Sequence, residues 1–176
     1  NVPGVALALP ALTARDRQDL RWAVENGVDI VSGSWVRCGD HVREIRQELE
    51  RWRHLAPAEV RTRCLTGRAS TTDAHDGLRT ARGAARIRVH AKIESKEAVT
   101  NLPDIIAAAD GVHVSRGDLG SELAPEQVFA AQKHAIGEAN RCATTVVTST
   151  QLLQSMVKNA SPTCAECTDV ANAVLD

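Results

Sequence analysis

The chain has 176 residues, of which 43% are hydrophobic and 24% charged, with a formal net charge of -1. This composition is ordinary for a soluble globular protein of one domain. The even charge balance argues against a general nucleic-acid or membrane-surface binder, and only 2% aromatic residues leave few side chains to stack on bases. We therefore expect neither nucleic acid nor a membrane as a partner.

The first third of the chain predicts two strand–helix pairs. Residues 5–9 form a short apolar run that predicts a strand. Thr13 is placed to cap a helix that ends at Asn26-Gly27, because Thr favours the N-cap and Gly the position after a helix. Residues 28–35 predict the next strand, and Asp40 is expected to cap a second helix.

A stretch rich in Arg, Thr, Ala and Gly follows at residues 54–85, with almost no apolar periodicity. Such a segment has little apolar surface to bury. It predicts a disordered, solvated insertion, and an Arg-rich arm that binds anions or nucleic acid is the alternative.

The alternation of strands and helices resumes after this insertion. In IRVHAKIE, residues 87–94, apolar and polar side chains alternate, as expected for a strand with one face in the core. The elements expected after it are a helical stretch ending near 110, a strand at 112–115, a loop at 116–120, a long helix from Pro125, a strand at 144–149, and helical segments at 151–158 and 163–175.

Strands that alternate with helices through short connections form parallel sheets. We count about five such strands, which predicts an α/β fold, a partial (β/α)8 TIM-type barrel. A complete barrel needs roughly 250 residues, so residues 1–176 are expected to form a single incomplete βα barrel domain. The chain has no GxGxxG, GxxxxGK[ST] or GxSxG motif, which weakens the dinucleotide-binding, P-loop and hydrolase alternatives.

The five cysteines include one CxxC pair, Cys164 and Cys167. Neither a second pair nor paired histidines accompany it, as a zinc site would require. The pattern favours reduced thiols within a helix over a metal or redox site.

Polar residues lie at the carboxyl ends of four successive predicted strands. In βα barrels the catalytic groups lie at these carboxyl ends. The residues concerned are Ser34, Lys92, Glu94, Arg116, Gly117, Asp118 and Thr150.

The spacing of these residues suggests a site for a cation and an anion. Glu94 and Asp118 end neighbouring strands, and two carboxylates with open positions suit Mg²⁺ or Mn²⁺. Lys92 would then neutralise a phosphoryl group or an enolate oxygen, although an internal Lys92–Glu94 ion pair is the plain structural alternative. The N–H groups of Gly117 and Asp118, with the Thr150 hydroxyl, are suited to bind a carboxylate. The expected ligand is a small phosphorylated acid.

Several of these segments resemble pyruvate kinase. They are NVPGVALALPALTARDRQDL, VDIVSGSWVR, AKIESKEAV, DGVHVSRGDLGSELAPEQVFAAQK, TSTQLLQSM and SPTCAECTDVANAVLD. The resemblance covers about residues 1–53 and 86–176. The Lys-Ile-Glu strand and the Arg-Gly-Asp-Leu-Gly segment at this separation carry most of it.

The resemblance implies phosphoryl transfer from phosphoenolpyruvate to ADP, which gives pyruvate and ATP in glycolysis. It implies Mg²⁺ and K⁺ as cofactors, with the K⁺ ligands outside this chain, a cytoplasmic location, and a homotetramer for a full-length form. By matching motifs, Lys92 resembles the catalytic lysine that also binds substrate, and Glu94 and Asp118 resemble the Mg²⁺ ligands. Gly117, Asp118 and Thr150 resemble the site for the substrate carboxylate. Ser34 and Arg116 resemble supporting residues.

The chain also departs from the family pattern. It corresponds to the middle of the family's barrel, without the lid domain and the C-terminal regulatory domain, so the isolated segment is expected to be inactive. His90 and His113 stand where apolar residues are usual, and we expect them to be core histidines. Ser95 replaces an Asn, and Cys164 an Arg. A non-catalytic fragment or divergent homologue that binds metal or a partner subunit is an open alternative, as is a lyase that handles phosphoenolpyruvate or pyruvate on a similar barrel.

Overall fold

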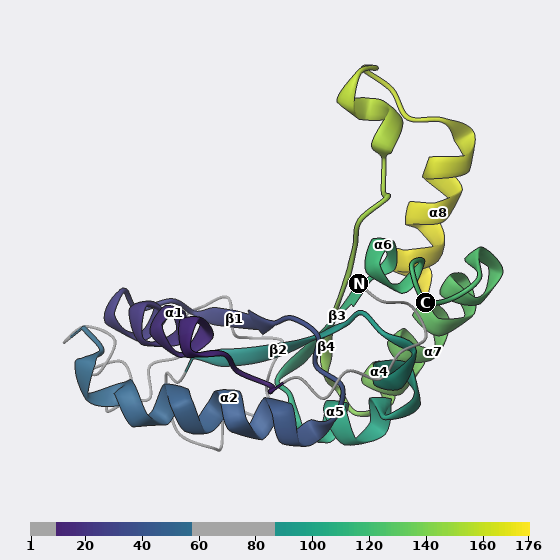
Figure 1. The fold of residues 1–176 in the computed structure, drawn as a ribbon. Coiled ribbons are helices and arrows are strands. Elements are labelled where there is room, and N and C mark those ends of the chain that lie inside the picture. The colour runs from purple at the N-terminus through teal and green to yellow at the C-terminus, as the bar shows by residue number, and fades with distance from the viewer. Residues whose placement is uncertain (1–9, 58–86) are drawn as a thin grey trace.

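The computed structural model describes residues 10–57 and 87–176, which form a parallel four-stranded sheet with helices packed on it (Figure 1). The strands are β1 (Ile30–Gly33), β2 (Arg88–Ile93), β3 (Gly111–Ser115) and β4 (Thr145–Ser149), and they lie side by side in chain order. This arrangement confirms the α/β fold and is that of a partial βα barrel. The first expected strand, at 5–9, lies outside the described residues, as does most of the expected insertion at 54–85.

The helices alternate with these strands. They are α1 (Ala14–Glu25), α2 (Gly39–Trp52), α4 (Lys96–Thr100), α5 (Leu102–Ala108), α6 (Arg116–Leu119), α7 (Pro125–Arg141) and α8 (Cys164–Leu175), with 3-10 turns η1 (Arg53–Leu55) and η3 (Gln154–Val157). In the ranges 10–57 and 87–176, no helix has both the length and the apolar character that crossing a membrane requires.

Local sequence signals set the start of three helices. Thr13 caps α1: its side chain accepts a hydrogen bond from the Asp16 N–H, and the Asp16 carboxylate accepts one from the Thr13 N–H. Thr163 and Glu166 form the same reciprocal capping box at α8. Pro125 is the first residue of α7, a position where its missing N–H costs nothing. These starts confirm the sequence expectations.

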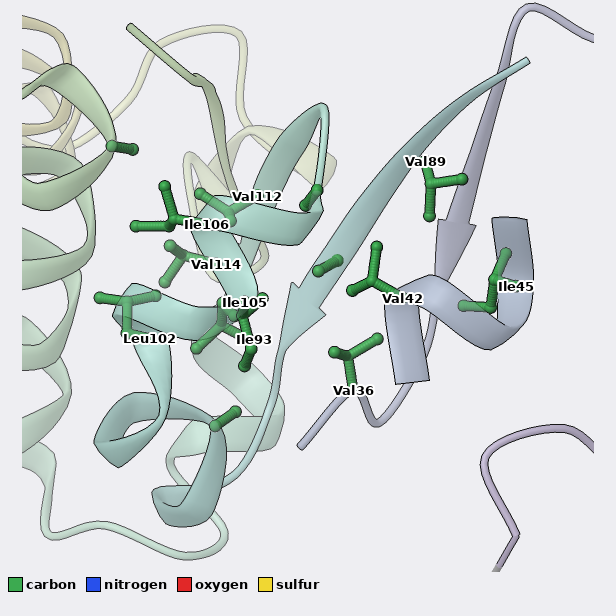
Figure 2. Packing of buried hydrophobic residues seen from close by; sticks show 14 of the residues in the cluster. Val36, Val42, Ile45, Val89, Ile93, Leu102, Ile105, Ile106, Val112 and Val114 are labelled. Carbon is green, nitrogen blue, oxygen red and sulfur yellow. The ribbon is translucent and has the colours of Figure 1, made fainter. Parts of the chain in front are cut away.

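One face of the sheet packs against helices to form the core. Val89, Ala91 and Ile93 of β2 are fully buried, as the alternation in that strand predicted. Figure 2 shows Ile93 and Val114 near Ile105, and Val89 near Val42 and Ile45. The opposite face of β2 carries the polar residues, which leaves this face available for a site.

The strand register places the carboxyl ends of β2, β3 and β4 at one edge. Ile93 pairs with Val114, and Ser115 pairs with Ser149. Glu94 therefore lies beside Ser115, and the residues just after β3 and β4 follow at the same edge. This edge is where the sequence predicted the functional residues to gather.

Three local expectations were wrong. Asp40 does not cap α2: Cys38 is at the N-cap, and the Gly39 N–H donates instead to Asp104 Oδ2 of α5 at 2.7 Å. A carboxylate from a neighbouring helix thus takes the role expected of a local one. The expected loop at 116–120 forms the single-turn helix α6.

The third wrong expectation was a helix at 151–158. Gln151 and Leu153 have φ angles of 56° and 54°, in the left-handed region, and only the 3-10 turn η3 follows. Left-handed residues cannot continue a right-handed helix. The chain instead leaves β4, extends to η3 and returns along α8 (Figure 1).

Candidate active site at the carboxyl edge of the sheet

An ion pair between a partly exposed lysine and a buried carboxylate lies at the end of β2. Lys92 Nζ is 2.5 Å from Glu94 Oε1, and Glu94 is only 2% exposed. Lys92 Nζ also donates to Ser34 Oγ at 3.4 Å, and the Trp35 N–H donates to Glu94 Oε2 at 2.6 Å. The segment after β1 therefore helps to fix both charged groups, and the internal ion pair that the spacing allowed is present.

The backbone of Trp35 takes an unusual conformation to reach this carboxylate. Its φ angle is 53°, in the left-handed region that non-glycine residues rarely adopt. The conformation accompanies the hydrogen bond from the Trp35 N–H to the buried Glu94 side chain. The sequence carried no signal for this contact, because the two residues are 59 positions apart.

A second group of polar residues lies where β3 and β4 end. Ser115 Oγ donates to Asp118 Oδ2 at 2.7 Å, and the Gly117 N–H donates to Thr150 Oγ1 at 2.8 Å. A Cβ at Gly117 would lie 3.3 Å from Thr150 Oγ1, so glycine permits this close approach. The Thr150 hydroxyl in turn donates to the Ser149 carbonyl at 2.6 Å. The Ser-x-x-Asp spacing is typical of a helix start and is the signal that could have indicated Ser115.

Arg116 joins this second group to α8. The residue is 8% exposed and its guanidinium is hydrogen-bonded to the carbonyl oxygens of Thr150 and Gln151. It also forms a two-pronged ion pair with Asp169. Asp169 was not among the residues expected from the sequence, and its place in a helix 53 positions away gave no local indication.

Two histidines lie on the polar face of the sheet. His113 is beside Lys92 in the strand register and is hydrogen-bonded to Ser149 Oγ. Burial, reinforced by the Lys92 charge, lowers the pKa of His113 below its usual value, and burial with the Arg88 charge lowers that of His90. Both rings therefore favour the neutral form. His90 is buried, as expected of a core histidine, whereas His113 is only partly buried.

The donor set at this edge suits a hard divalent cation. Carboxylate oxygens are the ligands that Mg²⁺ prefers, and each oxygen keeps acceptor capacity beyond one hydrogen bond. Glu94 and Asp118 follow neighbouring strands. Across the described ranges, no group of three or more His, Cys, Asp and Glu side chains is placed to hold a metal ion. A cation here would take its remaining ligands from water or substrate, as Mg²⁺ commonly does.

The geometry thus brings the expected residues together as two groups. Ser34, Lys92 and Glu94 form one of them. The other consists of Arg116, Gly117, Asp118 and Thr150, joined through contacts among β3, α6 and the end of β4. These features define a segment of a parallel βα barrel with charged groups at the carboxyl edge of its strands.

Comparison with known proteins identifies the family. The model of the pyruvate kinase barrel domain matches residues 1–57 and 68–176. The chain is 40% identical over 176 residues to the pyruvate kinase of Geobacillus stearothermophilus, and 40% identical to that of Agaricus bisporus. It is 38% identical over 177 residues to a cytosolic isozyme of pyruvate kinase from Solanum tuberosum. The chain belongs to the pyruvate kinase family.

These matches cover all of this chain but only part of each relative. The aligned region is 25% of the Geobacillus protein, 27% of the Agaricus protein and 29% of the Solanum protein. The chain therefore spans about a quarter of the length of the relatives that it matches.

Proposed function

We propose that this chain forms part of the active site of a pyruvate kinase, which transfers the phosphoryl group of phosphoenolpyruvate to ADP and gives pyruvate and ATP. The observation that carries the proposal is the Lys92–Glu94 ion pair at the same edge as the residues that follow β3 and β4, in a chain of this family. Phosphoryl transfer depends mainly on positioning and on stabilisation of charge. A lysine, two carboxylates and backbone N–H and hydroxyl donors at one edge are the groups that this chemistry needs.

Glu94 and Asp118 are the proposed ligands of Mg²⁺ or Mn²⁺. When bound, such a cation neutralises charge on phosphoryl and enolate oxygens. Before it binds, Lys92 balances the charge of the buried Glu94 carboxylate, and Ser115 orients that of Asp118. We place the K⁺ ligands in parts of a longer protein outside this chain.

Lys92 is the proposed catalytic residue and also contacts the substrate. Its ammonium group is held by Glu94 and by the hydroxyl of Ser34, whose role is supporting. In this position the positive charge stabilises the transferring phosphoryl group and the enolate oxygen that develops as the bond to phosphorus breaks. Lys92 is partly exposed, with 22% of its side chain accessible, so a substrate can reach it.

Gly117, Asp118 and Thr150 are the proposed binding site for the substrate carboxylate. The Gly117 N–H currently donates to the Thr150 hydroxyl. A carboxylate is a stronger acceptor than a hydroxyl because it is charged. We expect the substrate to accept hydrogen bonds from both groups, so that binding replaces their mutual contact.

The proposal also covers the second substrate, the cellular location and the assembly of the full-length enzyme. ADP is the second substrate, the location is the cytoplasm, and the assembly is a homotetramer, with neither nucleic acid nor a membrane as a partner. A cytosolic isozyme among the relatives supports the location. Arg116 has a supporting role.

The test compares Lys92→Met with the matched control Lys96→Met in the intact protein. Lys96 is an exposed lysine four residues away. We expect Lys92→Met to lower kcat by at least 100-fold, roughly the loss seen when one charge-stabilising donor is removed, whereas Lys96→Met stays near the parent value. Turnover is followed by coupling to lactate dehydrogenase, and Mn²⁺ binding by electron paramagnetic resonance.

The outcomes separate the candidate functions. Retained Mn²⁺ binding with lost turnover in Lys92→Met supports the proposed roles. Full activity of Lys92→Met refutes the assignment of the catalytic residue. An intact parent protein that binds Mn²⁺ but has no turnover would instead indicate a non-catalytic homologue.

A further inference from the structure

The segment just after β4 is held in an unfavourable backbone conformation. Thr150 and Gln151 have φ angles of 68° and 56°, and neither is glycine. The left-handed region is especially unfavourable for a β-branched residue such as Thr. Conformations of this kind persist only when the surrounding structure holds them.

Arg116 supplies the contacts to this backbone. Its Nε donates to the Thr150 carbonyl oxygen at 3.2 Å, and its Nη2 donates to the Gln151 carbonyl oxygen at 3.0 Å. With the φ angles held in this way, Thr150 Oγ1 lies 2.8 Å from the Gly117 nitrogen. The side chain of Arg116 thus fixes the backbone, and the backbone fixes the hydroxyl.

The guanidinium of Arg116 is itself fixed from α8. Asp169 accepts from Nη1 at 2.6 Å through Oδ1 and from Nη2 at 2.7 Å through Oδ2. A two-pronged pair of this kind fixes the plane of a guanidinium as well as its position. Gln132 of α7 accepts from Nη1 at 3.3 Å and completes the surroundings. The ribbon of α8 runs beside α6, the helix that begins with Arg116 (Figure 1).

We propose that Asp169 is a positioning residue for the substrate carboxylate site. Acting through Arg116, it holds Thr150 and Gln151 in the left-handed conformation that directs the Thr150 hydroxyl toward the Gly117 N–H. Asp169 touches neither substrate nor metal in this role. The inference rests on the proposed function for its consequence in catalysis, but the hydrogen-bonded chain from Asp169 to Gly117 can be tested without any substrate.

The test uses Asp169→Asn in the intact protein, with Asp176→Asn as the matched control. Asp176 forms an ion pair between the end of α8 and Lys133 of α7, away from Arg116. The first measurement is hydrogen–deuterium exchange by mass spectrometry in peptides that cover residues 115–120 and 149–153. We expect exchange to be at least about tenfold faster in Asp169→Asn, because the Gly117 N–H loses a fixed acceptor. The control should exchange like the parent.

The second measurement is steady-state kinetics with phosphoenolpyruvate. Asp169→Asn should raise KM for phosphoenolpyruvate roughly tenfold while kcat changes less, since the substrate carboxylate is held equally in the ground state and the transition state. A merely structural role would lower the amount of folded enzyme and leave KM unchanged. If Asp169→Asn does not fold, Arg116→Lys provides the same test, because lysine keeps the charge but lacks the planar fork.

The two measurements test different parts of the inference. Unchanged exchange in Asp169→Asn overturns the inference, whatever the kinetics show. Faster exchange with an unchanged KM overturns the role in carboxylate positioning. If the parent protein shows no turnover, the proposed function fails, and the exchange measurement still decides whether Asp169 holds the Thr150 segment.

Discussion

Replacing Gly111 by alanine should destabilise the sheet through a single clash. Gly111 begins β3 and pairs with His90 of β2. An added Cβ would lie 2.6 Å from His90 Nε2 and 2.8 Å from each of Cδ2 and Cε1. These distances are well inside ordinary van der Waals contact, which begins near 3.5 Å. His90 is 6% exposed, so its ring has little room to move away.

The loss of folding stability in Gly111→Ala follows from these short distances. Inserting one methyl group into a packed region typically costs about 1–3 kcal/mol, and contact with three ring atoms at once puts Gly111→Ala in the upper half of that range. For a domain of this size, 2–3 kcal/mol corresponds to a melting temperature lower by roughly 4–12 °C. The assay is thermal unfolding followed by circular dichroism.

Two further variants make the test specific. Gly137→Ala adds a methyl group with no atom within 4 Å, in the interior of α7, and should raise stability by up to about 1 kcal/mol because alanine favours the helix. The double variant Gly111→Ala with His90→Ala removes the ring and should recover part of the loss. If Gly111→Ala melts at the parent temperature, or if the double variant recovers nothing, the reasoning from the His90 ring is refuted.

Three other predictions concern pH, a helix start and activity. Hydrogen bonds from the Ser155 hydroxyl and N–H lower the pKa of Glu166 from 4.5 to about 2. The stability that this carboxylate contributes is therefore complete above pH 4.5 and is lost as the pH falls toward 2. A nuclear magnetic resonance titration midpoint for Glu166 near 4.5 would contradict this. Asp104→Ala should destabilise α2 by roughly 0.5–2 kcal/mol, because the Gly39 N–H and Arg43 lose a shared carboxylate. Urea denaturation measures this loss of stability. An unchanged denaturation midpoint would show that water replaces the carboxylate. The isolated 176-residue chain should show little or no pyruvate kinase turnover in the coupled assay, because it spans about a quarter of its relatives' length; robust turnover would overturn the view that further segments complete the site.

The sequence predicted the elements whose cause is local. The cap expected at Thr13 joins residues three positions apart, so the local pattern alone contains the interaction. The alternation in β2 likewise predicted which side chains face the core, because a strand turns successive side chains to opposite faces. The parallel register then follows from the strand–helix alternation. It brings the residues after β2 and β3 to one edge.

Contacts between segments far apart in the chain could not be predicted from local sequence patterns. The left-handed backbone that ended the expected helix at 151–158 is held by Arg116, which lies 34 and 35 positions before the two carbonyl groups it binds. The carboxylate at the start of α2 belongs to Asp104 and not to Asp40. Asp104 lies 65 positions after Gly39 and accepts a hydrogen bond from its N–H. Arg116 and Asp104 are ordinary polar residues in the sequence. No residue near either of them indicates which distant group it will bind.

The sequence by itself therefore determined the fold class, the edge where the polar residues gather and the chemical types available there. The tertiary structure alone decided which of those groups are tied to one another: the Trp35 N–H to Glu94, and Asp169 through Arg116 to Thr150. The physical reason is the range of the interactions. Helix caps and strand alternation act within a few residues and leave a periodic trace, whereas a hydrogen bond between two packed elements depends on their placement in space, which no local pattern records.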